Sequence, residues 1–174
     1  QRLAFDEIFS TFLVNSEIRK KIKKIKKKRK LIDKTKQNKI LKKLEFTLTQ
    51  DQIKTLEEIN NDLSSTNKMF RLLQGDVGSG KTIVSLLAAY NAVNSGFQVA
   101  FMAPTEILAR QHFNFAKKLF SKQINIELIS GKSEYKTKNE ILKKLINNKI
   151  NIIFGTHAIF QKKVNFNNLG LIIV

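Results

Sequence analysis

The stretch GDVGSGKT at residues 75–82 fits the pattern G-x-x-x-x-G-K-S/T. Glycines let such a loop wrap closely around phosphate oxygens, and the helix that follows adds its positive N-terminal end. In this pattern the lysine reaches the β- and γ-phosphates, and the final hydroxyl ligates Mg²⁺. We therefore predict a nucleoside triphosphate site in which Lys81 and Thr82 are catalytic and Thr82 is the metal ligand. Its predicted phosphate-binding residues are Gly75, Gly78, Ser79, Gly80, Lys81 and Thr82.

The surroundings of this loop predict an α/β fold. A short apolar run at residues 69–73 precedes the loop and reads as a strand, and residues 82–93 are apolar nearly all round, as in a buried helix. Further apolar runs alternate with helical patterns, which is typical of a parallel sheet covered on both faces. The predicted strands are 97–103, 124–129, 150–154 and 169–174, and the predicted helices are 49–63, 106–120 and 136–147.

Two local signals fix helix ends. Thr49 and Gln52 have the spacing of a capping box at the start of the helix over 49–63. Gly96 stands where a glycine closes the helix over 82–93.

The first 45 residues have a different character and are predicted to be a basic helical linker. Phe5, Ile8, Phe9 and Phe12 follow the spacing of an amphipathic helix, which the isoleucines of the next segment can extend. Ten of the twelve residues from Arg19 to Lys30 are basic. Two interpretations of that run stay open, a solvated charged helix and a segment that grips DNA phosphates.

Composition narrows the class of protein. The formal net charge of +18 indicates a polyanionic partner, although an abundance of Lys, Ile and Asn is also typical of AT-rich genomes. The chain has no cysteine, which excludes disulfides and thiolate metal sites. No window reaches the length of a membrane span, and the first residues carry no apolar signal sequence, so we expect a cytoplasmic protein.

Four segments resemble the RecG branch-migration helicases of helicase superfamily 2. The phosphate loop with the preceding RLLQ stands as that family writes it, and APTEILARQH at 103–112 resembles its motif Ia. GTHAIFQ at 155–161 is similar to its next DNA-facing motif, and RLAFDE at 2–7 is similar to the helix that leads into the motor. The resemblance implies that residues 46–174 are the N-terminal part of a first RecA-like P-loop NTPase domain, incomplete in this chain and preceded by a long basic helix.

The resemblance also implies ligands and site residues. The cofactors would be ATP and Mg²⁺, and the partner would be branched DNA such as forks and Holliday junctions, with no obligate protein partner. Phe46 and Gln52 match the adenine-contacting Q motif, although Gln52 can equally serve only the capping box. The implied DNA contacts are Pro104, Thr105, Thr156 and His157, which in isolation would be ordinary turn residues.

Catalytic acids are expected beyond this chain. In superfamily 2 the strand that matches residues 171–174 is followed by Asp-Glu-x-His, whose acids hold Mg²⁺ and orient the attacking water. We therefore expect the chain alone not to hydrolyse ATP. Two other functions stay open: a translocase of the transcription-repair coupling type, which has a similar phosphate loop, and an ATP-switched DNA-binding module that unwinds nothing.

Overall fold

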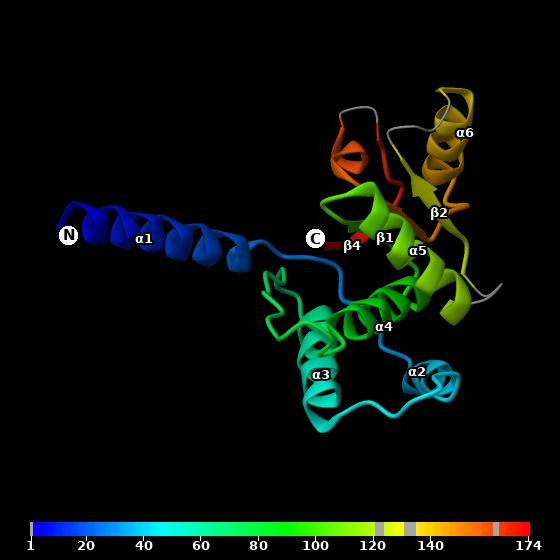
Figure 1. The fold of residues 1–174 in the computed structure, drawn as a ribbon, viewed down its shortest axis with the longest axis horizontal. Helices are drawn as coiled ribbons and strands as arrows, with labels where there is room; N and C mark the ends of the chain where they lie inside the picture. The colour runs from blue at the N-terminus through cyan, green and yellow to red at the C-terminus, as the bar shows by residue number, and fades with distance from the viewer. Residues whose placement is uncertain (1, 121–123, 131–134, 162–163) are drawn as a thin grey trace.

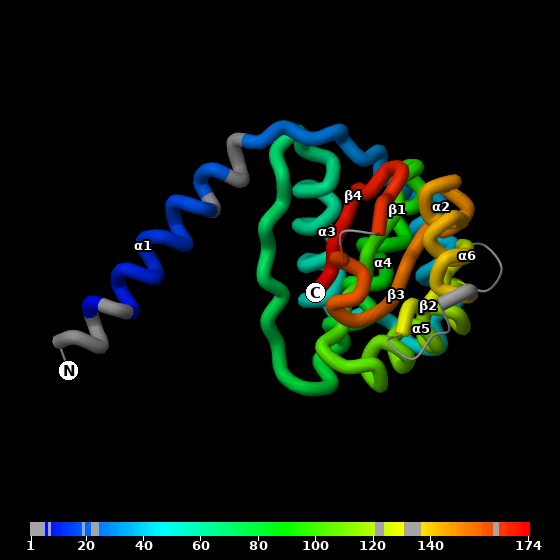
Figure 2. The backbone as a smooth tube through the Cα atoms, turned by 90° about the horizontal axis from the view of Figure 1, so that it is seen from above, coloured from blue at the N-terminus to red at the C-terminus, as the bar shows by residue number. Residues whose placement is uncertain are grey.

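The computed structural model describes residues 2–120, 124–130, 135–161 and 164–174. It consists of an α/β body from which one long helix, α1, projects (Figures 1 and 2). The elements in chain order are α1 (Arg2–Lys24), α2 (Lys34–Leu41), α3 (Gln50–Ser64), α4 (Lys81–Asn94), β1 (Gln98–Met102), α5 (Glu106–Phe120), β2 (Ile126–Ile129), α6 (Tyr135–Ile146), β3 (Ile152–Gly155), the 3₁₀ helix η1 (His157–Phe160) and β4 (Leu169–Ile173).

The sheet has four strands in the order β2-β3-β1-β4, and every pairing is parallel. This confirms the predicted α/β class. In a parallel sheet all the carboxyl ends of the strands meet at one edge, where such folds bind their ligands. The residues that follow β1, β3 and β4 therefore lie at one edge of the body.

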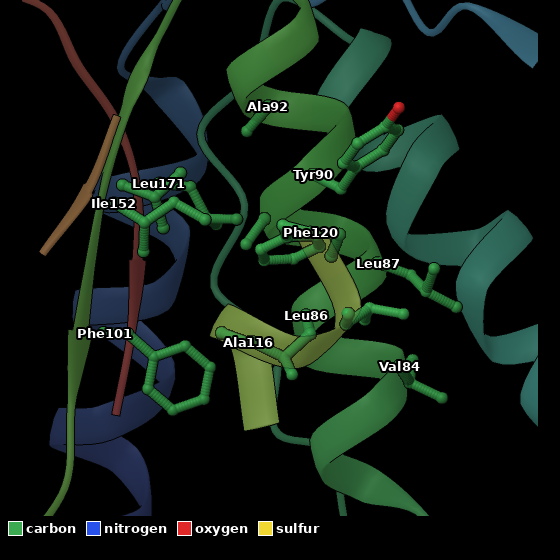
Figure 3. Close-up of a cluster of buried hydrophobic side chains, with 14 of the residues drawn as sticks. Val84, Leu86, Leu87, Tyr90, Ala92, Phe101, Ala116, Phe120, Ile152 and Leu171 are labelled. Atoms are coloured by element: carbon green, nitrogen blue, oxygen red, sulfur yellow. The ribbon is translucent and has the colours of Figure 1, made fainter. Parts of the chain in front are cut away.

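Apolar side chains fill both faces of the sheet. One cluster joins β1, β3 and β4 to α3, α4 and α5, and Figure 3 shows its centre, with Phe101, Ile152 and Leu171 of the sheet near Leu86 and Phe120. A second cluster joins the opposite face to α6 and η1. The sheet is thus covered on both sides, which explains why its strands are continuous apolar runs in the sequence.

The predicted strand at residues 69–73 is wrong. This segment forms no ladder with any described strand. Residues of this segment and of β4 line the same cavity of about 640 Å³. An apolar run becomes a strand only where it joins the backbone ladder of a neighbouring strand, and this segment does not join the described sheet.

Helix α2 was not predicted. The Asp33 carboxylate accepts hydrogen bonds from the backbone N–H groups of Thr35 and Lys36, at 2.9 and 3.1 Å, and so caps its first turn. Ile40 is the single buried residue of the helix and is fully enclosed in the main core cluster. The core of the body therefore begins ahead of residue 46.

Helix α1 confirms the long N-terminal helix but ends at Lys24, within the basic run. Residues 25–30 leave the helix and run along the turn after α3. Ile8 and Phe12 of the predicted stripe are exposed, at 71% and 69%, whereas the side chains of Phe5, Arg19 and residues 22–24 lie outside the described part. None of the described helices is long and apolar enough to cross a membrane.

Candidate nucleotide-binding site

The phosphate loop has the backbone that its glycines predict. Gly78 and Gly80 have φ angles of 83° and 82°, a left-handed conformation that side chains rarely adopt. A Cβ at Gly80 would also overlap the amide of Gln52. These two glycines let the chain turn sharply into α4, which begins at Lys81.

The start of α4 leaves backbone N–H donors free beside the phosphate loop. The first three N–H groups of α4, at residues 81–83, have no protein acceptor in the part of the chain that the structure describes. The Lys81 ammonium donates to the carbonyl oxygens of Gly75 and Asp76, both at 2.7 Å. A phosphate group fits this cradle, because it can accept from the N–H groups while Lys81 turns from the carbonyls toward it.

Gln52 ties α3 to the phosphate loop. Its Oε1 accepts from the backbone N–H of Thr49 at 3.0 Å, and its Nε2 donates to the carbonyl of Ser79 at 2.9 Å. The N–H of Gln52 donates to Thr49 Oγ1 in turn, which completes the predicted capping box. Gln52 lines a cavity of about 400 Å³ together with Gly75, Ser79 and Lys81.

The structure does not bring Phe46 into that cavity. Phe46 lines a separate cavity of about 700 Å³ near the end of α2, which the phosphate loop does not reach. Ile53 lines the Phe46 cavity and Gln52 lines the loop cavity, so the first turn of α3 borders both. The two predicted adenine contacts therefore lie on adjacent cavities.

Thr82 faces a third space, between the loop and the sheet. This is the 640 Å³ cavity beside β4, and Lys81, Thr82, Pro104 and His112 all line it. His112 packs against Phe101 with ring centroids 5.3 Å apart, and burial lowers the pKa of its imidazole. The cavity connects the phosphate loop with the first of the predicted DNA contacts.

The predicted DNA contacts lie together at the carboxyl edge of the sheet. Pro104 and Thr105 follow β1, and Thr156 and His157 follow β3, which is the strand next to β1 with Met102 opposite Gly155. Pro104, Thr105 and His157 are exposed, and Thr156 is partly exposed. Exposed side chains at one sheet edge suit contacts to a phosphate backbone, and that role remains a prediction.

Sequence reasoning gave Arg71 no role, yet it anchors the segment ahead of the loop. Its guanidinium binds Glu58 at 2.7 Å and Asp62 at 2.9 Å, both on α3. Chiefly the hydrogen bond to Asp62 raises its pKa. The four-residue spacing of the two acids on one helix face was the only local signal for this anchor.

Comparison with known proteins places this arrangement in a family. Residues 49–174 match the family described as DEAD/DEAH box helicase. Over its whole length the chain is 43% identical to the ATP-dependent DNA helicase RecG of Thermotoga maritima and 42% identical to that of Aquifex aeolicus. It spans 22% of the length of each of these proteins.

Solved structures of helicases have the same fold as this chain. A structure of RecG bound to a three-way DNA junction superposes with a TM-score of 0.88 at 43% identity, over 98% of this chain and 24% of that one. The UvsW helicase of bacteriophage T4 has a TM-score of 0.57 at 18% identity, over 83% of this chain and 51% of its own, and shares the fold alone. The chain therefore belongs to the DEAD/DEAH box helicase family, in which it is a segment of the RecG type.

Proposed function

We propose that the protein that carries this chain is an ATP-dependent DNA helicase that acts on branched DNA, such as forks and Holliday junctions. The observation that supports this most is identity of 43% along the whole chain to a RecG helicase, with every position of the phosphate-loop pattern present. A relative of the same identity was solved on a three-way DNA junction, which supports branched DNA as the partner.

In this proposal the loop holds the triphosphate of ATP. The free N–H groups at the start of α4 would bind phosphate oxygens, and Lys81 would neutralise charge on the β- and γ-phosphates. The Thr82 hydroxyl would ligate Mg²⁺, which when bound supplies further neutralisation of the phosphates. Gln52 and Phe46 would contact the adenine.

The carboxyl edge of the sheet would hold one DNA strand. Hydroxyls of Thr105 and Thr156, the backbone beside Pro104 and the imidazole of His157 suit contacts to phosphates and sugars, which position a strand without reading its sequence. Lys81, Thr82 and Pro104 line one cavity. Hydrolysis or release of the bound nucleotide would therefore change the surroundings of Pro104 at the DNA edge.

The test is ATP hydrolysis by the intact protein with fork-shaped DNA and with linear duplex of equal length. We expect the fork to stimulate hydrolysis several-fold more than the duplex. The variant Lys81→Ala should lose about 100-fold or more in rate, because it removes a cation placed where charge develops. Lys54→Ala, which removes an exposed lysine of α3, is the matched control.

Three outcomes would count against the proposal. Equal stimulation by fork and duplex would point to a translocase without branch preference. Nucleotide-dependent DNA affinity without strand displacement would point to a switched binding module. Full activity of Lys81→Ala would remove the phosphate loop from the mechanism.

A further inference from the structure

The end of the basic run is a folded strap, not a free helix. The backbone of residues 25–30 pairs with the turn after α3: Lys27 N–H donates to the Thr66 carbonyl at 2.7 Å, and Lys68 N–H donates to the Ile25 carbonyl at 3.2 Å. Farther along, Lys30 N–H donates to the Leu63 carbonyl at 3.2 Å. We call residues 25–30 the strap.

Lys27 of the strap uses all three of its ammonium N–H groups in hydrogen bonds to the end of α3. The Lys27 ammonium donates to the carbonyls of Asp62, Leu63 and Ser65, at 3.0, 2.7 and 2.8 Å. These carbonyls end α3, where a cation also meets the negative end of the helix dipole. Lys27 has three N–H donors and three acceptors, so it has none left for a ligand.

A second lysine is enclosed without an acid. Lys30 is 2% exposed, and its ammonium lies over the ring of Phe97, 4.4 Å from the centroid. Phe97 is held in turn against the backbone of β4, since a Cβ at Gly170 would overlap it. In the described part of the chain no carboxylate pairs with Lys30, and Asp62, in the last turn of α3, is bound by Arg71.

Lys30 remains a cation at neutral pH. Burial, with a smaller contribution from the Lys27 ammonium, lowers its pKa to about 8. An enclosed charge without a counter-ion is costly, and the cost falls when an anion binds beside it.

The space beside Lys30 is open to such an anion. A cavity of about 410 Å³ is lined by Lys27, Lys28, Lys30 and Lys68, and none of the described acidic side chains lines it. Lys28 and Lys68 are exposed, so their ammonium groups can turn toward a ligand at the mouth. The phosphate-loop residues do not line this cavity, so it is separate from the nucleotide site.

We propose that this cavity binds a phosphate group of a nucleic-acid backbone, held by Lys30 on the inside and by Lys28 and Lys68 at the mouth. A phosphodiester carries one charge that no change in pH near neutrality removes, and a neighbouring phosphate along the strand can meet the second mouth lysine. The inference rests on the proposed function only in taking DNA as the partner, because forks and simple duplexes have the same backbone.

The test measures affinity of the intact protein for labelled linear duplex over a range of salt concentrations. We expect Lys30→Met to weaken binding several-fold and to lower the slope of log affinity against log salt by about one. The double variant with Lys28→Met and Lys68→Met should lower the slope by at least about one, because it releases the neighbouring phosphate. Lys39→Met, an exposed lysine of α2 outside the cavity, controls for loss of one charge. Methionine keeps an apolar stem over Phe97, and an unchanged circular dichroism spectrum verifies the fold.

A second arm separates the backbone from free phosphate. Broadening of the phosphorus-31 resonance of inorganic phosphate that is weaker with Lys30→Met than with the wild type, while the DNA slope stays unchanged, would overturn the nucleic-acid assignment; the phosphate loop contributes equally to both proteins. Slopes unchanged in Lys30→Met and in the variant that carries Lys28→Met and Lys68→Met, with the same phosphorus-31 broadening in Lys30→Met as in the wild type, would overturn the site altogether. Both arms use linear duplex or phosphate, so a failure of the branched-DNA proposal would not affect them.

Discussion

Gln52 uses both ends of its side-chain amide. It accepts from Thr49 N–H at the start of α3 and donates to the Ser79 carbonyl in the phosphate loop. The capping bond could be predicted from the sequence because its partner is three residues away. The bond to Ser79 could not, because it spans 27 residues and depends on how α3 packs beside the loop.

These two hydrogen bonds limit how Gln52 can contact adenine. An amide with both ends engaged contacts adenine only through its remaining N–H or lone pair, or by giving up one of these bonds. The adenine role of Gln52 therefore stays a prediction, and a base in the Phe46 cavity would have to reach across the first turn of α3.

Lys30 makes stability depend on pH. Its pKa is about 8 in the folded chain, against 10.5 for an ordinary lysine. Between these values the unfolded chain binds more protons, so the free energy of unfolding rises with pH through this window. Below pH 8 both states are protonated and the penalty is fully present. We expect a rise of the order of 1 kcal/mol from this group.

The measurement is the urea midpoint of the wild type and of Lys30→Met, at both ends of that window. The other ammonium groups around the cavity, Lys27, Lys28 and Lys68, are common to both proteins, so the difference isolates Lys30. Lys30→Met should be the more stable protein at neutral pH, and its advantage should shrink as the pH rises. An advantage that is constant with pH would show that Lys30 titrates as an exposed lysine.

Helix α2 shows why some helices cannot be predicted from the sequence pattern. Asp33 caps the helix in the structure, but the helix buries only Ile40 and has no apolar stripe that would predict it. The opposite error occurred at residues 69–73, where the apolar content of a strand is present without a ladder partner. The helices with a capping box or a closing glycine were predicted well, because those signals act within one turn.

A buried polar network, in place of a stripe, docks α2. Asn91 of α4 donates to Gln37 Oε1 at 2.9 Å and to Asn60 Oδ1 at 2.8 Å, and Asn60 donates to Gln37 Oε1 at 3.0 Å. Asn91→Leu removes two hydrogen bonds from enclosed acceptors, so we expect a loss of about 1–3 kcal/mol. Urea unfolding measures the loss, and hydrogen exchange at residues 34–41 should accelerate first.

Asn114→Leu is the matched control, since Asn114 lies on the exposed face of α5. It should leave both the midpoint and the exchange of α2 unchanged. If α2 exchanged at its wild-type rate in Asn91→Leu, the network would not be what holds this helix.

At the scale of the molecule, the nucleotide and DNA contacts predicted from the sequence lie at one edge of the sheet, and a buried polar anchor lies at the other. The phosphate loop and the predicted DNA contacts lie at the carboxyl ends of the strands, as in other α/β folds. The phosphate loop could be predicted because its chemistry lies within eight consecutive residues. The cavity beside Lys30 could not, since it forms only where the strap, Phe97 and β4 meet.

The amino edge is held by Gln98, the first residue of β1, which is 1% exposed. Its Nε2 donates to the carbonyls of Leu145 and Ile150, at 2.8 and 2.9 Å, and its Oε1 accepts from the N–H groups of Asn167 and Asn168, at 2.9 and 3.0 Å. One side chain thus joins the end of α6, the approach to β3 and the turn before β4.

Gln98→Met keeps the length of the side chain but removes one hydrogen bond from each of these four backbone groups, of which the Leu145 carbonyl still accepts from the Asn148 N–H at 3.2 Å. We expect it to cost roughly 2–4 kcal/mol in the free energy of unfolding, because buried polar groups without partners are expensive. Gln74→Met, in the exposed segment ahead of the loop, should cost nothing measurable. Where both proteins are fully folded, the nucleotide affinity of Gln98→Met should equal that of the wild type, because none of the partners of Gln98 belongs to the phosphate loop. A drop in nucleotide affinity that matched the loss of stability would mean that the two edges of the sheet are coupled.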